Sequence, residues 1–442
     1  MNALAQLDQA VNFGMEELTG LRISGTVTEV TPSYYRLAGL SHFLKLGECV
    51  GINHCGSTQL AEVVRIDATG STVKTFEAQV AAGLGDPAFR IGRLRVAPAP
   101  SWKGRVIDAL GRPIDARGPL RRGEHALPIE AQPPAALQRA RVKTPVKTGV
   151  RVIDLFMPIC AGQRIGVFAG SGVGKSTLLG MIAGSKGFDT VVIALVGERG
   201  REVREFLDDS LGPNRDLAVT VVATGDESPM MRRLAPKTAL TIAEFFRDRG
   251  ENVLLIVDSV TRFAHAARDV ALAAGEPAVA RGYAPSVFSD LPKLLERAGP
   301  GVQGSGSITG IFAVLVDGDD HNDPVADNIR GTLDGHIVLD RAIADQGRFP
   351  AVNILSSISR LAQHVWTKDQ QVLVMKLKAM IARYEDTRDL RLMGGYQPGQ
   401  DGELDQAVAL VPRLYEAVMQ SPANPLSRDA FQELAEALQQ AK

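Results

Sequence analysis

The sequence predicts an α/β protein with a small N-terminal β-barrel, a core built on a mainly parallel sheet, and a C-terminal helical domain. Residues 21–97 alternate apolar and polar side chains in short runs separated by glycine, which is typical of a small barrel. Apolar runs at 164–168, 190–196 and 252–257 are typical of parallel strands buried on both faces. Beyond residue 361, apolar residues recur at helical spacing.

Shifts in composition divide the chain into four segments. Residues 1–20 form an amphipathic segment with apolar residues at helical spacing, which either packs on its own protein or docks a partner. The barrel follows over 21–97, and Ala97-Pro-Ala-Pro100 is a linker. The core domain covers 98–361 and the helical domain 362–442.

Composition narrows the function classes. The net charge of −1 over 442 residues provides no general attraction to nucleic acid or to an anionic membrane. Cys49, Cys55 and Cys160 have neither metal-ligand spacing nor a paired framework, which suits a reducing compartment. With no signal peptide or long apolar segment visible, we expect a cytoplasmic protein.

A phosphate-binding loop is predicted at Ala169-Gly-Ser-Gly-Val-Gly-Lys-Ser176, between an apolar run and a helical pattern. Its glycines let amide groups converge on an anion, Lys175 reaches the outer phosphates, and the Ser176 hydroxyl can ligate Mg²⁺. Ala169 departs from the strict pattern, which has glycine there, and the alternative is a glycine-rich turn opening an ordinary helix. The expected nucleotide contacts in this stretch are Gly170, Ser171, Gly172, Val173, Gly174, Lys175, Ser176 and Thr177.

Two carboxylates follow predicted strands. Glu198 comes just after the run 190–196, and Asp258 ends the run 252–257. Ligands of parallel sheets gather at the carboxyl ends of the strands, so Glu198 is the expected catalytic base and Asp258 an expected support for Mg²⁺. The alternatives are a surface salt bridge for Glu198 and a helix cap for Asp258. Loop and carboxylate together predict Mg²⁺-dependent ATP hydrolysis.

Arginine side chains are needed to stabilise the charge on a transferring phosphoryl group. Arg199, Arg262 and Arg360 are the candidates, on the strength of the motifs that contain them.

Three motifs besides the phosphate loop carry a resemblance to a known family: Gly197-Glu-Arg-Gly-Arg-Glu-Val203, Leu255-Ile-Val-Asp-Ser-Val-Thr-Arg262 and Pro350-Ala-Val-Asn-Ile-Leu-Ser-Ser-Ile-Ser-Arg360. They resemble the hexameric ATPases of the ATPase alpha/beta chains family, which includes the catalytic subunit of rotary ATP synthases. Residues 275–288, 294–299 and 333–339 resemble the type III protein-export ATPases, the flagellar branch in particular. The match is specific from about Gly104 to Arg360 and weaker elsewhere.

The resemblance implies a RecA-like phosphate-loop core, ATP and Mg²⁺ as cofactors, and a homohexamer. It implies that Glu198 polarises the attacking water, with Arg199 and Arg262 near the terminal phosphate. Arg360 would act as an arginine finger in the neighbouring subunit's site, and Phe349 would stack on the adenine. Tyr396 is a weaker candidate for that pocket, with core packing as its alternative.

The resemblance also implies partners. These are an export-apparatus regulator at the N-terminal segment, a stalk-like protein, the export gate, and complexes of substrates with their chaperones. Peripheral association with the cytoplasmic face of the inner membrane is expected, and nucleic acid is not.

Three functions compete. The first is flagellar type III export, with the virulence (injectisome) secretion system as its near alternative. The second is a rotary ATP synthase catalytic subunit, which would need an acidic run that residues 361–442 lack. The third is an RNA translocase, for which Tyr34, Tyr35 and Arg36 are a thin basis.

Overall fold

The structure, a computed structural model, describes residues 23–79, 81–316 and 323–439. The amphipathic segment expected at residues 1–20 lies outside them. The chain divides into two compact units. One contains the chain up to residue 94 together with 228–230 and 269–276, and the other contains the remainder.

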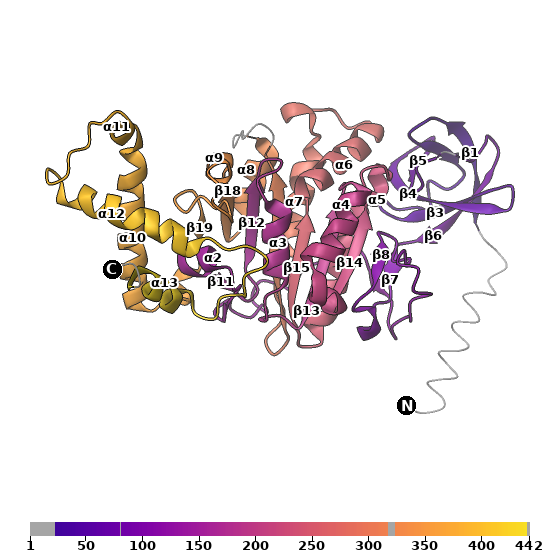
Figure 1. Cartoon of the computed structure of the whole chain (residues 1–442). Helices are drawn as coiled ribbons and strands as arrows, with labels where there is room; N and C mark the ends of the chain where they lie inside the picture. Colours follow the sequence, from indigo (N-terminus) through magenta and orange to yellow (C-terminus); the bar gives the residue numbers. More distant parts are fainter. Residues whose placement is uncertain (1–22, 80, 317–322, 440–442) are drawn as a thin grey trace, which may run out of the picture. The chain divides into compact units, whose positions relative to one another are not determined.

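The first unit is built on a closed barrel with strand order β1-β2-β5-β4-β3-β6, drawn in indigo and violet (Figure 1). Its strands are β1 (Ser24–Val30), β2 (Tyr35–Ala38), β3 (Cys49–His54), β4 (Ser57–Asp67), β5 (Gly70–Thr75) and β6 (Pro87–Gly92). Alternate side chains such as Leu37, Ile52 and Val63 fill its interior. The predicted barrel is confirmed.

The second unit is built on a sheet with the order β19-β18-β12-β17-β15-β13-β14-β8. Every neighbouring pair in this order is parallel except β18 with β19, and β16 adds an antiparallel pairing to β17. The strands are β8 (Val106–Asp108), β12 (Arg164–Ala169), β13 (Thr190–Val196), β14 (Ala218–Ala223), β15 (Asn252–Asp258), β16 (Gly299–Pro300), β17 (Ser307–Leu315), β18 (Gly335–Leu339) and β19 (Ile358–Ser359). Two short pairs lie apart from it: β7 (Arg95–Val96) with β9 (Leu127–Pro128), and β10 (Pro145–Val146) with β11 (Ile159–Cys160).

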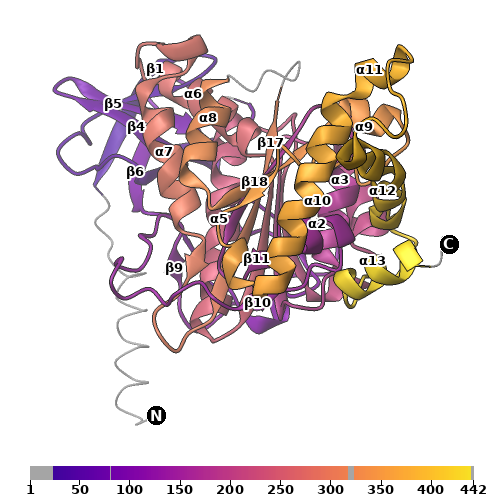
Figure 2. The same ribbon diagram turned by 90° about the vertical axis from the view of Figure 1, so that its left-hand side faces the viewer.

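Helices cover both faces of this sheet. One face joins α2 (Arg151–Phe156), α3 (Lys175–Ala183) and the C-terminal helices in a single apolar cluster. On the other face, α7 (Pro285–Glu296) and α8 (Pro324–Thr332) lie against the strands, as Figure 2 shows, and the Arg330 guanidinium sits 4.8 Å from the Phe168 ring centre. The remaining helices of the core are α4 (Gly200–Glu205), α5 (Pro229–Asp248), α6 (Val260–Ala273) and α9 (Arg341–Asp345), with a π-helical turn at Phe206–Ser210.

The C-terminal domain is helical, as the sequence predicts. It consists of α10 (Lys368–Asp386), α11 (Arg388–Leu392), α12 (Gly402–Val418) and α13 (Ala430–Gln439). Thr367 and Gln370 form a reciprocal capping box that begins α10. Figure 2 shows α12 beside α10, and Leu377 and Leu414 belong to the same cluster as the sheet. The predicted fold class is therefore confirmed in all three parts.

Candidate functional site

The phosphate loop joins the end of β12 to the start of α3. Gly172 and Gly174 have φ angles of +78° and +92°, a left-handed conformation that favours glycine. Gly174 is the N-cap residue immediately before α3, so the loop leads directly into a helix N-terminus. Ser176 and Thr177 are exposed on the first helical turn. The loop therefore offers amide and hydroxyl donors at the positive end of a helix dipole, which suits phosphate.

Lys175 lies between two carboxylates. Its Nζ atom forms an ion pair with Asp258 at the end of β15 and stands 3.5 Å from Glu198 Oε1, just beyond β13. Because β13 and β15 are parallel neighbours, both carboxylates reach the same edge of the sheet. The three side chains retain only 11% (Lys175), 14% (Glu198) and 3% (Asp258) of their exposure. One ammonium group thus faces two largely buried carboxylates.

Burial raises the pKa of Glu198 to about 6, and the negative charge of Asp258 pushes it the same way. The Lys175 ammonium opposes this rise without cancelling it. The carboxylate is ionised at neutral pH, yet it is a stronger base than an ordinary glutamate. These are the properties that a general base needs.

Arg262, in the first turns of α6, packs against the turn that leads to Glu198. Gly197 has φ +69°, and a Cβ atom there would stand 2.6 Å from Arg262 Cδ. Only glycine fits this approach without displacing the arginine. Arg262 Nε is buried and has no hydrogen-bond partner in the described part of the chain. Its charge also acts on the Glu198 carboxyl, lowering the pKa against the effect of burial.

The other two predicted arginines lie elsewhere. The Arg199 side chain is 76% exposed and stands 3.5 Å from Glu202, one turn along α4. Arg360 is exposed and directly follows β19, the outermost strand of the sheet. Neither joins the group around Lys175 within this single chain. Arg360, at the edge of the sheet, is therefore not part of the group around the phosphate loop of its own chain.

Phe349 lies beside the phosphate loop. A Cβ atom at Gly174 would be 3.7 Å from the Phe349 ring, and Phe349 is 44% exposed. Phe349 lines a cavity of about 270 Å³ together with Arg348 and Tyr415. The Arg348 guanidinium lies 3.9 Å from the Tyr415 ring centre. A flat aromatic ligand group next to the phosphate loop would fit this cavity.

Tyr396 is not among the residues that line this cavity. Its hydroxyl donates over 2.7 Å to Asp405, in the first turn of α12. Tyr415 is the tyrosine that lines this cavity, and the sequence analysis did not single it out. No sequence signal marks it, because Tyr415 reaches Phe349 only through the way that α12 folds back in the structure.

Arg341 was also missed. Its Nη2 atom donates to the Ser171 carbonyl over 2.9 Å and so contacts the phosphate loop directly. Arg341 follows β18 at the carboxyl edge of the sheet, just as Glu198 follows β13. The rule that singled out Glu198 and Asp258 would have found it.

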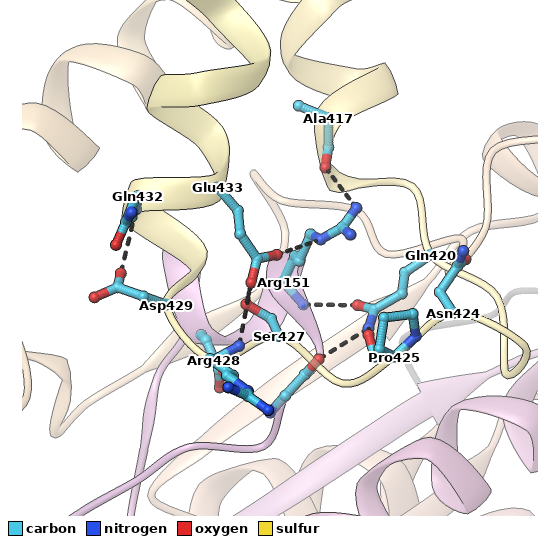
Figure 3. Close-up of polar contacts among 12 residues, drawn as sticks. Arg151, Ala417, Gln420, Asn424, Pro425, Ser427, Arg428, Asp429, Gln432 and Glu433 are labelled. Carbon is cyan, nitrogen blue, oxygen red and sulfur yellow. Dashed lines mark hydrogen bonds and ion pairs between the residues drawn. The ribbon is translucent and has the colours of Figure 1, made fainter.

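The C-terminal domain is joined to the pocket through Gln420. Gln420 is 3% exposed, and Figure 3 shows its side chain accepting from the Arg151 amide. Its amide nitrogen donates to the Pro425 carbonyl over 3.3 Å. Its amide nitrogen also donates to the Gly149 carbonyl over 2.9 Å. The Gln420 backbone N–H donates to the Phe349 carbonyl over 2.9 Å. A single buried residue therefore links α2, α12 and the aromatic wall of the pocket.

Arg151 completes this junction from the α2 side. Its guanidinium donates to Glu433 over 2.8 Å and to the carbonyls of Ala417 and Met419 over 3.2 Å, at the end of α12 (Figure 3). Glu433 in turn accepts from the Ser427 hydroxyl over 2.8 Å. The junction is thus hydrogen-bonded from both helices of the C-terminal domain that approach α2.

The residues present fit Mg²⁺ held partly by phosphates. Ser176 and Asp258 offer the hydroxyl and carboxylate oxygens that Mg²⁺ prefers. Among the residues the structure describes, no group of three histidine, cysteine or acidic side chains could hold a metal by itself. This agrees with the usual mode of Mg²⁺ binding, in which substrate phosphates and water supply most ligands. No helix among the described residues is long and apolar enough to cross a membrane.

Two family profiles match the chain. The nucleotide-binding domain of the ATP synthase alpha/beta family matches residues 149–359, and the T3SS EscN ATPase C-terminal domain matches residues 366–440. The flagellum-specific ATP synthase of Agrobacterium fabrum is 55% identical over 435 residues, covering 98% of this chain and 92% of that protein. The type 3 secretion system ATPase of Xanthomonas euvesicatoria is 40% identical over 407 residues and covers 91% of both chains.

Solved structures agree. The assembled ATPase EscN from the type III secretion system of enteropathogenic E. coli has a TM-score of 0.87 at 39% identity, covering 94% of this chain and 99% of that chain. The same ATPase in complex with its central stalk EscO has a TM-score of 0.84 at 39% identity, with the same coverage. The resemblance inferred from the motifs is confirmed.

Proposed function

The chain belongs to the ATP synthase alpha/beta family, among its type III export ATPases, and we propose that it hydrolyses ATP to energise export of flagellar proteins. The observation that carries this proposal is Lys175 held between Glu198 and Asp258 beside the phosphate loop. The flagellar assignment is supported by 55% identity to a flagellum-specific ATP synthase, against 40% to a type 3 secretion system ATPase.

In the proposed reaction, the loop amides and Lys175 bind the phosphates of ATP. A phosphate at the loop competes with Asp258 and Glu198 for the Lys175 ammonium, which leaves the two carboxylates without their shared cation. Glu198, with its pKa raised to about 6, accepts the proton of the attacking water. Arg262, whose Nε has no partner in the described part of the chain, stabilises the charge that develops on the terminal phosphate. Ser176 and Asp258 would hold Mg²⁺, which would neutralise part of the phosphate charge.

The adenine occupies the cavity beside Phe349. The ring of Phe349 stacks on the base, and Tyr415 with Arg348 forms the far wall. Stacking on aromatic faces is tolerant of base identity, so the phosphate contacts dominate affinity.

A homohexamer completes the site in this proposal. Arg360 is exposed and directly follows the outermost strand, so it can reach the nucleotide of a neighbouring subunit, where an arginine finger is worth a large rate factor. The related EscN is known as an assembled ATPase and in complex with a central stalk, which supports a ring and a stalk partner here. A regulator at the N-terminal segment, the export gate, substrate–chaperone complexes and association with the inner membrane stay predictions.

The test is the rate of Mg²⁺-dependent ATP hydrolysis against protein concentration, for wild type, Glu198→Gln, Arg360→Ala and a mixture of the two variants. We expect specific activity to rise with concentration and each variant to be inactive alone. The mixture should regain activity, because some interfaces then pair an intact Glu198 with an intact Arg360.

Two results would contradict the proposal. A rate independent of concentration, with Arg360→Ala fully active, would mean that the site is complete within one chain. Wild-type hydrolysis by Glu198→Gln would remove the proposed base. Size-exclusion chromatography with ATP, run on each variant, separates loss of assembly from loss of chemistry.

A further inference from the structure

A strained hairpin in the barrel carries a cysteine. β3 and β4 are joined by the two residues Cys55 and Gly56, which have φ angles of +46° and +83°. Positive φ at both positions is the geometry of a type I′ turn, for which asparagine followed by glycine is favoured. Cysteine has a Cβ atom that disfavours this conformation, so the turn holds Cys55 at an energetic cost. Such a cost is typical of positions kept for a purpose other than stability.

The thiol at this turn stands beside a histidine. Cys55 Sγ is 3.4 Å from His54 Nε2, and His54 Nδ1 is 2.7 Å from Asp86 Oδ2. Asp86 is held in place by the Gly83 amide, which donates to the same carboxylate oxygen over 2.6 Å. The order thiol, imidazole, carboxylate is that of a nucleophile with a base and a group that orients the base.

The arrangement is in line and does not converge on one point. The two imidazole nitrogens point away from each other, and each faces a different residue, so the three groups do not surround a common centre. This excludes the simplest alternative, a metal site, in keeping with the absence of a metal-holding cluster among the described residues.

The thiol is accessible. Cys55 is exposed, and the His54 side chain retains 37% of its exposure. Cys49 and Cys160, by contrast, are fully buried, with 0% exposure each. A reagent in solution therefore meets one thiol of the chain before the other two.

We propose that Cys55 is a nucleophilic thiol, activated by His54 and Asp86, that is modified by thiol–disulfide exchange with small disulfides. His54 Nε2 takes the proton from Sγ, and the resulting thiolate attacks one sulfur of a disulfide R–S–S–R. A bond forms between Cys55 Sγ and that sulfur while the R–S–S–R bond breaks. The second thiolate leaves with the electron pair and receives the proton from His54. The Asp86 carboxylate stabilises the imidazolium in between.

The test treats the full, reduced chain with oxidised glutathione and follows the added mass, with peptide mapping to locate it. We expect one glutathione to add first, at Cys55, and this fast phase to vanish in Cys55→Ser. At neutral pH His54→Asn should slow the fast phase roughly tenfold, because an unassisted thiol is only a few per cent ionised. Ser57→Ala is the matched control in the same hairpin, where only the hydroxyl bond to the His54 carbonyl is lost, and should react at the wild-type rate.

Alkaline pH separates a missing base from a distorted turn. If His54 acts as the base, His54→Asn should approach the wild-type rate once solution alone ionises the thiol. The proposal is wrong if His54→Asn matches wild type at neutral pH, or if its deficit persists unchanged at alkaline pH. It is also wrong if glutathione adds first to Cys49 or Cys160.

Discussion

Two groups of buried, oppositely charged side chains in the core unit differ in how completely their charges are paired. At the nucleotide edge, one ammonium serves the two carboxylates Glu198 and Asp258, and Arg262 Nε has no partner in the described part of the chain. Between α5 and α7, the Arg297 guanidinium donates to both oxygens of Glu244, at 2.9 and 2.8 Å, with both side chains below 10% exposure.

In the second group, the Arg297 guanidinium has further hydrogen-bond partners besides Glu244. Arg297 donates further to the Ile129 carbonyl over 2.8 Å and to the Thr241 hydroxyl over 2.9 Å. Next to it, burial would raise the pKa of Glu296, but the guanidiniums of Arg164 and Arg139 bring it below its usual value. Glu198 has the opposite shift. The fully paired charges of Arg297 and Glu244 have a structural role. Glu198 and Arg262, which have fewer partners, can still interact with a substrate.

Of the substitutions that test this comparison, Glu198→Gln should have the largest effect. Removal of the base should lower the turnover rate by roughly 10²–10⁴-fold while the unfolding midpoint stays near that of wild type, because Glu198 is poorly compensated in the folded state. Steady-state hydrolysis and a denaturant melt measure both. Glu205→Gln, exposed at the end of the helix α4 that follows Glu198, is the control and should keep its activity. A melt that falls together with the rate would show that Glu198 is structural.

Arg297→Met should show the reverse pattern. It leaves Glu244 buried and unpaired, so the free energy of unfolding should fall by about 3–5 kcal/mol. The double variant Arg297→Met with Glu244→Leu should recover most of this loss, because no charge is then left without a partner. Denaturant unfolding of the three proteins decides the matter. A double variant as unstable as the single one would mean that the pair itself stabilises the fold.

Gln420→Leu sharpens the comparison at the junction behind Phe349. It leaves the Arg151 amide and the Gly149 carbonyl without their buried partner, at about 1–3 kcal/mol for each group. We expect a lower melting temperature and a KM for ATP raised several-fold, because the Phe349 loop loses its fixed neighbour. Gln432→Leu, an exposed glutamine nearby on α13, should change neither. An unchanged KM in Gln420→Leu would show that the hydrogen bonds of Gln420 do not influence nucleotide binding at the pocket.

Arg341→Ala should have the smallest effect of the four. It removes one hydrogen bond to the Ser171 carbonyl, and such a bond contributes about 0.5–1.5 kcal/mol. KM for ATP should therefore rise up to roughly tenfold with little change in kcat. Arg341→Lys should fall between the two proteins. A change confined to kcat would instead place Arg341 in the chemical step.

Much of this site follows from strand–loop–helix rules applied to the sequence. The phosphate loop, Glu198 and Asp258 could be predicted because each directly follows an apolar run of a parallel sheet. Arg341 obeys the same rule and could have been included. Of the fold, the barrel, the parallel core and the helical domain all follow from periodicity.

What could not be predicted depends on distant segments meeting. Tyr415 and Gln420 reach the pocket only because the end of α12 packs against α2. No local pattern in the sequence predicts that packing. The pKa of Glu198 depends on how deeply Lys175 and Asp258 enclose it, which spacing does not reveal. The His54–Asp86 contact likewise joins the end of β3 to the residue before β6, two positions that β4 and β5 separate along the sequence.

The most direct test of the account is an infrared titration of the Glu198 carboxylate without nucleotide, as the difference between wild type and Glu198→Gln. The account predicts a midpoint near 6, with the ionised band lost as the pH falls through that value. In Lys175→Met the midpoint should rise, because the opposing ammonium is gone. A midpoint at the ordinary value of about 4.3, unmoved by loss of Lys175, would contradict the claim that an incomplete set of partners makes Glu198 a base.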